Sequence, residues 1–380
     1  MADADRTSLR ELAQLFLKLG TIGFGGPAAH IAMMEDEVVR RRGWLTREQF
    51  LDYLGATNLI PGPNSTELAI HIGYGRRGWP GLLVAGVGFI LPAALIVTGL
   101  AGAYVRFGTV PAATGVLYGV KPVVIAVVVQ ALWGLGRSAL KTSWLGVLGV
   151  GAVIATILGV DELLVLAAAG VIAPLSRGVR RRWRSVVAFT PPLAWPRVLA
   201  GAAVTSASVG LWPLFGVFAK VGAVLFGSGY VLLAFLRADL VQRLHWLTEQ
   251  QLLDAVAVGQ VTPGPLFTTA TFIGYVVAGG AGAVVATIGI FLPAFVFVAA
   301  SGPLVPRLRR SPTAGAVLDG VNVASLALMA VVTWQLGRAA LVDWPSAALA
   351  LISALLLLHY RVNSAWLVLL GGLVGVLLKA

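Results

Sequence analysis

The sequence predicts an all-α polytopic membrane protein built from two inverted structural repeats with interrupted helices. Composition, recurring apolar stretches and an internal repeat predict this class. Of 380 residues, 58% are hydrophobic and 12% are charged, whereas soluble domains average about 25% charged. Stretches long enough to cross a bilayer, roughly 17–25 residues each, are clearest at 79–104, 112–136, 281–304 and 314–337. We expect roughly 12–13 membrane segments in all.

Composition also excludes several functions. Residues 1–14 lack the cationic stretch, apolar core and cleavage site of a signal peptide, so we expect no cleaved leader. The absence of cysteine excludes disulfides and thiolate metal sites, and we expect no cofactor. Much of the net charge of +12 lies in short loops beside apolar spans, for example at 177–184. This is the positive-inside pattern of membrane proteins, so we expect no nucleic-acid partner.

Residues of the first half recur in order in the second half. The offset is 202 positions and becomes 201 after one deletion. An ordered series that includes Trp and Asp is not explained by a Gly-rich composition. We expect a first repeat at 1–185, a linker with one extra span at 186–211, and a second repeat at 212–380. The matched pairs include Lys18 with Lys220, Phe24-Gly25-Gly26 with Phe226-Gly227-Ser228, Trp44-Leu45-Thr46 with Trp246-Leu247-Thr248, Asp52 with Asp254, Pro61-Gly62-Pro63 with Pro263-Gly264-Pro265, Tyr74 with Tyr275, and Trp133 with Trp334.

The distribution of arginine predicts that the two halves have opposite orientations. Arg76 and Arg77 precede the span at 79–104, whereas arginines follow the equivalent span at 281–304. If basic loops are cytoplasmic, equivalent helix ends lie on opposite sides of the membrane. An even number of crossings in each half then requires an extra span, which residues 192–211 can supply. The N-terminus is expected in the cytoplasm and the C-terminus on the other side.

Each half contains two breaks that point to a transport site. An apolar helix breaks at Gly25-Gly26-Pro27 in the first half and at Gly227-Ser228-Gly229 in the second, and a Pro-Gly-Pro element follows in each. Irregular backbone at membrane depth is tolerated only inside protein or beside a watery cavity. Inverted repeats with interrupted helices are typical of secondary transporters, which hold the substrate near the midplane. The sequence therefore favours a transporter.

The residues at these breaks favour a small oxyanion. Helix N-termini, expected after each Pro-Gly-Pro element, bind anions, and lysines inside apolar spans usually mark an ion path. Other interpretations stay open: Lys18 can reach the membrane interface, the proline elements can be plain kinks, and the matched polar pairs Asn58 with Gln260 and Lys121 with Asn322 can be interhelical hydrogen bonds. The expected substrate-binding residues are Lys18, Gly25, Gly26, Asn58, Pro61, Gly62, Pro63, Asn64, Ser65, Thr66, Lys121, Lys220, Gly227, Ser228, Gly229, Pro263, Gly264, Pro265, Thr268, Thr269 and Asn322.

Two further residues are candidates for ion coupling. Glu67 and His71 lie four residues apart, on one face of the helix that follows the first Pro-Gly-Pro element. A carboxylate beside an anion site must be protonated, paired or used in proton coupling. A structural Glu67–His71 pair is the alternative. Asp52 and Asp254 can brace short helices near the surface.

The chain resembles the chromate ion transporters in their long-chain, two-domain form. The resemblance lies in Phe24-Gly25-Gly26-Pro27, Trp44-Leu45-Thr46 and Pro61-Gly62-Pro63-Asn64, and in the second-half copies, where Ser228 replaces a glycine. It implies an inner-membrane protein of bacteria or archaea that exports chromate and so confers resistance, with sulfate as the related anion. A dianion gains about 4.6 kcal/mol on leaving a cell with an inside-negative potential of 100 mV, which favours export.

Alternatives remain at the level of sequence. Sulfate or another small anion presents the same charge and geometry as chromate. A membrane-embedded enzyme is less favoured, because the four histidines and the carboxylates form no recognisable catalytic or metal motif. The oligomeric state, monomer or homodimer, is open.

Overall fold

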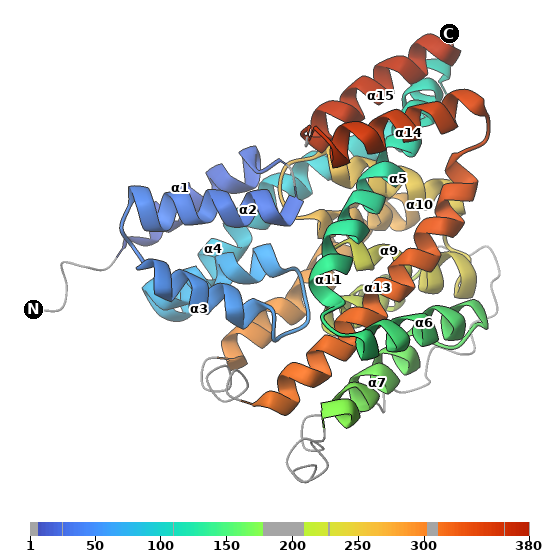
Figure 1. Cartoon of the computed structure of the whole chain (residues 1–380). Coiled ribbons are helices and arrows are strands. Elements are labelled where there is room, and N and C mark those ends of the chain that lie inside the picture. The colour runs from blue at the N-terminus through green and yellow to red at the C-terminus, as the bar shows by residue number, and fades with distance from the viewer. Residues whose placement is uncertain are drawn as a thin grey trace, which may run out of the picture.

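The computed structural model describes residues 7–24, 26–108, 110–177, 209–226, 229–301, 311–360 and 362–379, and within them the chain is helical with no strand (Figure 1). This confirms an all-α protein. The helices of the first half are α1 (Leu9–Ile22), α2 (Gly26–Glu35), α3 (Arg47–Thr57), α4 (Asn64–Phe107), α5 (Pro111–Ala139), α6 (Ser143–Ile157) and α7 (Glu162–Ile172). Those of the second half are α8 (Leu211–Val224), α9 (Leu232–Leu236), α10 (Glu249–Val261), α11 (Thr269–Ser301), α13 (Pro312–Ala340), α14 (Trp344–Leu358) and α15 (Ser364–Lys379).

Several helices recur in the second half with the same bounds at the repeat offset. Helix α8 begins and ends 202 residues after α1, and α13 and α14 begin and end 201 residues after α5 and α6. Local signals repeat as well. Thr46 caps α3 in a capping box with Gln49, and Thr248 caps α10 in the same way with Gln251, so the side chains satisfy the free N–H groups of both helix starts. The opposite orientation of the halves stays a prediction.

Helices α4 and α11 each consist of two segments that fold back on each other. The helical path is broken at Arg77-Gly78 in α4 and at Ala278-Gly279 in α11, where both glycines have positive φ. In α4, Gly73 lies against Gly81 so closely that a Cβ on either would overlap the backbone of the other. Gly274 and Gly282 make the same contact in α11. Each repeat therefore has a short helix after its Pro-Gly-Pro loop and then a tight turn into a long helix.

Four helical stretches are long and apolar enough to cross a membrane: 64–107, 113–139, 266–301 and 312–340. These stretches contain all of the predicted spans 79–104 and 314–337. They also contain residues 113–136 of the predicted span 112–136 and the described residues 281–301 of the predicted span 281–304. Five shorter apolar helices accompany them. Large apolar side chains are exposed on the outside, for example Trp133 at 62% and its repeat equivalent Trp334 at 71%. Such a surface fits a lipid environment. Residues 192–208 of the predicted extra span lie outside the described residues.

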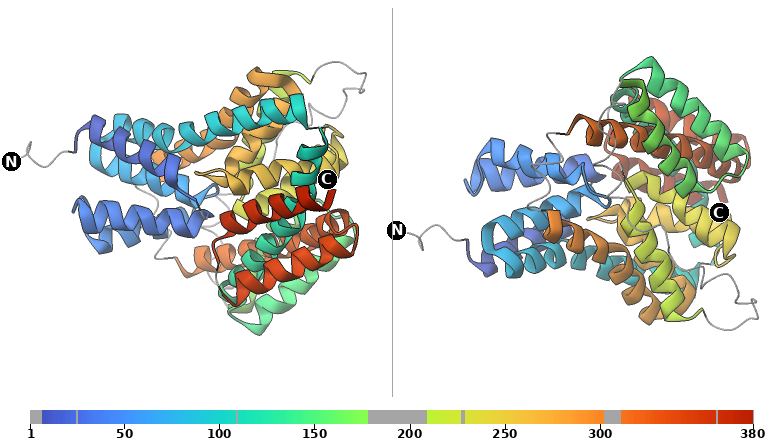
Figure 2. Two further views of the ribbon diagram at one scale, coloured as in Figure 1. Left: turned by 90° about the horizontal axis from the view of Figure 1, so that it is seen from above. Right: turned by 90° about the horizontal axis from the view of Figure 1, so that it is seen from below.

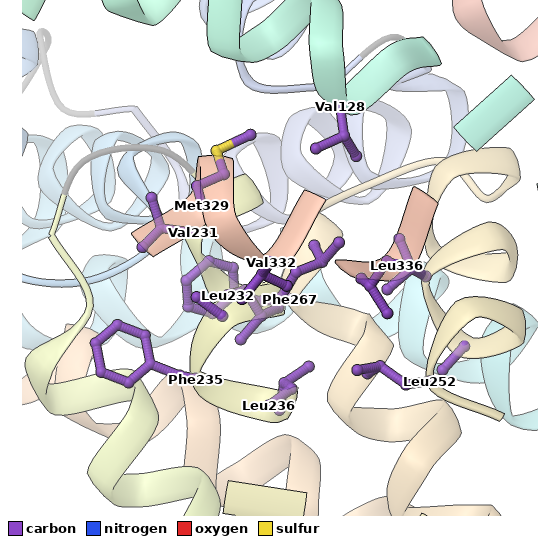
Figure 3. Close-up of a cluster of buried hydrophobic side chains, with 14 of the residues drawn as sticks. Val128, Val231, Leu232, Phe235, Leu236, Leu252, Phe267, Met329, Val332 and Leu336 are labelled. Carbon is purple, nitrogen blue, oxygen red and sulfur yellow. The ribbon is translucent and has the colours of Figure 1, made fainter. Parts of the chain in front are cut away.

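The two halves exchange their last helices. Helix α5 packs against α14 and α15 of the second half, and α13 packs against α6 and α7 of the first. Helices α1–α3 form one end of the molecule and α6, α7, α14 and α15 form the other (Figure 2). The main apolar core lies between the halves: Figure 3 shows Val128 of α5 facing Met329 and Val332 of α13, with Leu252 of α10 and Phe267 nearby.

Candidate functional site

The two Pro-Gly-Pro loops dock reciprocally on the two halves. The Gly62 N–H donates a hydrogen bond to the Leu225 carbonyl at the end of α8, with an N–O distance of 2.8 Å. The Gly264 N–H donates to the Gly23 carbonyl at the end of α1, also at 2.8 Å. These four residues are two pairs of repeat equivalents. We call the two loops and the helix ends that they contact the loop crossing.

Only glycine fits at the centre of either loop. Gly264 has φ +87°, and a Cβ there would lie 2.6 Å from Cβ of Ala93 and 3.2 Å from the Gly20 carbonyl oxygen. Gly62 has φ +141°, and a Cβ there would overlap the Glu67 carboxyl. Glycine adopts such φ values readily and leaves room for a close neighbour. The loop centre at Gly264 is therefore in close contact with the other half, whereas the centre at Gly62 is closed by Glu67 of its own half.

A small pocket lies on the second-half side of the loop crossing. It is lined by Gly26, Pro27, Gly259, Gln260, Thr262, Gly264 and Leu266. The Gln260 amide nitrogen is buried and has no hydrogen-bond partner among the described residues. Helix α2 begins at Gly26, so its first-turn N–H groups lack intrahelical acceptors. An amide donor and the positive end of a helix thus lie at one pocket, a combination suited to an anion.

The polar residues after the first loop are arranged differently. Asn64 donates a side-chain hydrogen bond of 2.9 Å to the Asn58 side chain, which in turn donates to the Leu54 carbonyl. Ser65 and Thr66 are buried, and the Thr66 hydroxyl has no partner among the described residues. The structure brings these residues together at the start of α4, as expected from the sequence.

The equivalent hydroxyls after the second loop point into their own helical turn. Thr268 donates to the Pro265 carbonyl at 2.9 Å, and Thr269 donates to the Leu266 carbonyl at 2.8 Å. Their protons are therefore already used. Gly229 packs beside Leu266 and Phe267. Gly25, Gly227 and Ser228 lie outside the described residues.

Lys18 and Lys220 are held by carboxylates. Lys18 Nζ lies 2.6 Å from Glu37, and Lys220 Nζ lies 2.9 Å from Asp239. The two acids are repeat equivalents on π-helical segments, Asp36–Arg41 and Arg237–Arg243. The hydrogen bond from Lys18 holds the pKa of the Glu37 carboxyl below its ordinary value. Sequence reasoning missed both partners, although an acid that recurs at the repeat offset was a readable signal.

The two lysine pairs predict unequal effects on stability. Lys220 is 16% exposed and Asp239 4%, so we expect Lys220→Met to cost about 3 kcal/mol, the lower end for breaking a buried pair, because Arg243 remains at 2.8 Å. Lys18 is 49% exposed, so Lys18→Met should cost at most about 1 kcal/mol. Thermal unfolding in detergent measures both. Equal losses of Tm would contradict this prediction, and a tenfold loss of anion affinity in Lys18→Met at unchanged Tm would place Lys18 on the anion path.

Lys121 links the halves. Its Nζ lies 3.0 Å from Asp254 and 2.7 Å from the Gln250 side-chain oxygen, both on α10. The Tyr104 hydroxyl, at the end of α4, donates to Asp254 at 3.0 Å. Asp254 is 3% exposed, so it is a buried ion-pair partner, not the surface brace considered from the sequence. Asn322, the repeat equivalent of Lys121, lies on α13.

Glu67 lies in the first turn of α4 and is fully buried. Neither carboxyl oxygen has a hydrogen-bond partner among the described residues. His71 follows one turn later at 7% exposure, and its ring stacks on Tyr53 of α3 with centroids 5.8 Å apart. The alternative of a structural Glu67–His71 pair has no hydrogen bond among the described contacts: the Nε2 atom of His71 has no partner, and neither carboxyl oxygen of Glu67 has one.

Comparisons with known proteins identify the family. A family model described as chromate transporter matches residues 10–174 and again 212–376. The chain is 36% identical to the chromate transport protein of Cupriavidus metallidurans, over 93% of this chain and 89% of that protein. It is 32% identical to the chromate transport protein of Pseudomonas aeruginosa, over 97% of this chain and 92% of that protein.

A shorter relative covers about one repeat. An uncharacterized transporter of Bacillus subtilis is 35% identical over 130 residues, which are 34% of this chain and 73% of that protein. No solved structure matches the chain. With the family model matching both halves and relatives aligned over most of the chain, the protein is a multi-pass membrane protein that belongs to the chromate transporter family.

Proposed function

We propose that the protein exports chromate across the inner (plasma) membrane by alternating access between its two halves. The observation that carries this proposal is the loop crossing, where each half donates one backbone hydrogen bond to the other. The two contacts are equivalent in the repeat, so one can open while the other closes. Rocking of two repeats around a fixed site is the common mechanism of transporters with this type of architecture.

In this conformation the pocket has room for about one water molecule, so the anion is expected to bind between the α2 start and the second Pro-Gly-Pro loop when the loop crossing opens. The buried Gln260 amide and the first turn of α2 supply donors there, and an oxyanion accepts several hydrogen bonds at once. Lys18, Lys220 and Lys121 all hold carboxylates in this conformation. They contribute to binding only if the transport cycle releases them.

Electrostatics supports both the direction of anion transport and the orientation of the protein in the membrane. An inside-negative potential of 100 mV moves a dianion outward with about 4.6 kcal/mol, at about 2.3 kcal/mol per charge. The tight turn of α4 carries Arg76 and Arg77, whereas the equivalent turn of α11 is formed by Ala278 and Gly279. The positive-inside rule then puts the α4 turn and the N-terminus in the cytoplasm.

Everted membrane vesicles provide the test, because their outer face is the cytoplasmic face. We expect saturable accumulation of labelled chromate, driven by a potential that is positive inside the vesicle. Vesicles that lack the protein are the control. If the protein adds no chromate accumulation, the export assignment is wrong.

Gln260→Leu is expected to weaken chromate binding between roughly tenfold and a hundredfold, because a hydrogen bond to a charged group contributes about 1.5–3 kcal/mol. The concentration of chromate at half-maximal uptake measures this. Gln130→Leu is the matched control: Gln130 of α5 is also partly buried and donates to the Leu357 carbonyl of α14, and neither residue lines the pocket. Equal uptake curves for Gln260→Leu and the wild type would remove the pocket from the anion path.

Sulfate is the main alternative substrate, because it is also a tetrahedral dianion. Unlabelled sulfate added to the chromate assay decides between the two. Stronger inhibition by sulfate than by unlabelled chromate would make sulfate the preferred anion. A catalytic role remains the less favoured class, since the family is one of transporters.

A further inference from the structure

We propose that Glu67 is a proton-carrying site that couples anion movement to proton movement, an inference that rests on the proposed transport function. Glu67 has an exposed fraction of 0%. Both of its carboxyl oxygens are buried and lack a hydrogen-bond partner among the described residues. The carboxyl lies directly against Gly62, the residue whose N–H bonds the second half at the loop crossing.

An ionised carboxylate does not fit these surroundings. A buried charge without a partner is strongly unfavourable, and such groups become neutral instead. In this conformation Glu67 therefore holds a proton. If the loop crossing opens, water reaches the carboxyl and the proton can leave. The position beside Gly62 links the proton of Glu67 to the contact that must change during transport.

The groups around Glu67 do not neutralise it by ion pairing. On its own helix the nearest titratable residue along the same face is His71, whose Nε2 also has no partner among the described residues. From α3, Tyr53 stacks on His71. From α2, His30 is bonded to the Gly23 carbonyl at 2.8 Å, and on the α11 side Ala294 faces Gly62.

Two buried or partly buried charged residues of helices that contact α4 are engaged elsewhere. Lys18 of α1 is held by Glu37, and Asp254 of α10 is held by Lys121. Within the described part of the chain, neither bonds to the Glu67 carboxyl. A proton is therefore the remaining means of neutralising this group.

His71 and Tyr53 offer a route from Glu67 toward water. His71 is one helical turn from Glu67, so the two side chains lie on one face of α4. Tyr53 stacks on the His71 ring and is itself only partly buried. A proton leaving the carboxyl can pass to the imidazole and then to water beside the phenol.

The carboxyl, imidazole and phenol groups of this route are present in one repeat only. The equivalent of Glu67 is Thr269, whose hydroxyl bonds its own turn, and His71 and Tyr53 correspond to Phe272 and Ala255. The pocket with the unpartnered amide belongs to the second loop. The two repeats therefore have different roles. The second Pro-Gly-Pro loop and its pocket offer hydrogen-bond donors to the anion, and the helix after the first loop holds the proton on Glu67.

The coupling of anion and proton movement follows from the charge of the Glu67 carboxyl. An anionic Glu67 at the loop crossing would repel a dianion, whereas a protonated Glu67 would not. Anion and proton then occupy the loop crossing together, so each exported dianion carries a proton out and one net negative charge leaves. The proton is taken from the side on which the anion binds and is released with it on the other.

The test uses everted vesicles with the potential clamped by potassium and valinomycin, a pH dye in the lumen and labelled chromate outside. For the wild-type protein we expect lumen acidification that tracks chromate entry, one proton for each chromate. Glu67→Gln, which keeps the shape of the protonated acid, should abolish acidification while chromate still enters. Glu48→Gln, an exposed change on neighbouring α3, should behave as wild type.

The outcomes separate the two proposals. If wild-type vesicles take up no chromate, the transport proposal fails. If they take up chromate without acidification, or if Glu67→Gln still acidifies the lumen, only the coupling inference is overturned. Should Glu67→Gln fail to fold, the wild-type ratio of protons to chromate decides by itself.

Discussion

Gly264→Ala is expected to lower chromate transport at least about tenfold, which corresponds to about 1.4 kcal/mol or more. The added Cβ would lie 2.6 Å from Cβ of Ala93 and 3.2 Å from the Gly20 oxygen. Alanine also resists a φ of +87°, and non-glycine residues in such conformations cost on the order of 1–3 kcal/mol. The loop must therefore move away from Ala93 of α4 and Gly20 of α1, which should break the Gly264–Gly23 hydrogen bond. Uptake of labelled chromate into everted vesicles measures the loss.

Two glycine controls separate the causes. Gly78 also has positive φ, at +61°, but a Cβ added there would meet no atom within 4 Å, and Gly216 in α8 has neither crowding nor positive φ. Gly78→Ala should therefore lose some stability but retain more transport than Gly264→Ala, and Gly216→Ala should resemble the wild type. Tm in detergent reports stability separately from transport. Wild-type transport by Gly264→Ala would show that the second Pro-Gly-Pro loop can be displaced without loss of transport.

Lys121→Met is expected to destabilise the protein by about 3–5 kcal/mol, because it leaves a buried carboxylate without its counter-ion. The side chains of Lys121 and Asp254 are 14% and 5% exposed, and among the described residues the Tyr104 hydroxyl would remain to bind the carboxylate. Since Lys121 belongs to α5 and Asp254 to α10, the loss weakens the contact between the halves. A lower Tm in detergent and slower chromate uptake should appear together.

A double-mutant cycle isolates this pair. Adding Asp254→Asn to Lys121→Met removes the unpaired charge, so the double variant should be more stable than the sum of the single changes predicts, by about 0.5–3 kcal/mol. Lys141→Met is the matched control, because Lys141 also pairs across the halves, with Asp319 at 2.8 Å, but is 57% exposed. It should cost at most about 1 kcal/mol. Strict additivity in the cycle would show that the Lys121–Asp254 pair does not stabilise the fold.

Features that depend on residues close together in the sequence could be predicted. The apolar spans in α4, α5 and α13 were predicted because their length and composition exceed what a soluble helix needs. The start of α4 at Asn64 was predicted because proline ends one helix and suits the first turn of the next. The capping boxes at Thr46 and Thr248 follow a local pattern of the same kind.

Contacts between distant segments could not be predicted. The hydrogen bonds of the Gly62 and Gly264 N–H groups join backbone to backbone, so no side chain records them. The Lys121–Asp254 pair requires knowing how α5 packs on α10. The partners of Lys18 and Lys220 are different, because an acid recurs at Glu37 and Asp239 with the same spacing as the lysines. That recurrence could have identified both pairs.

The reciprocal hydrogen bonds at the loop crossing make neither half a self-sufficient folding unit. Alone, each half would leave one loop N–H and one helix-end carbonyl without these partners, and an unsatisfied backbone group inside a membrane costs several kcal/mol. A single repeat must therefore assemble with a second one to satisfy its backbone. Joining both repeats in one chain fixes that partnership at one to one. It also lets the copies diverge, as they have here, with Glu67 in one and Thr269 in the other.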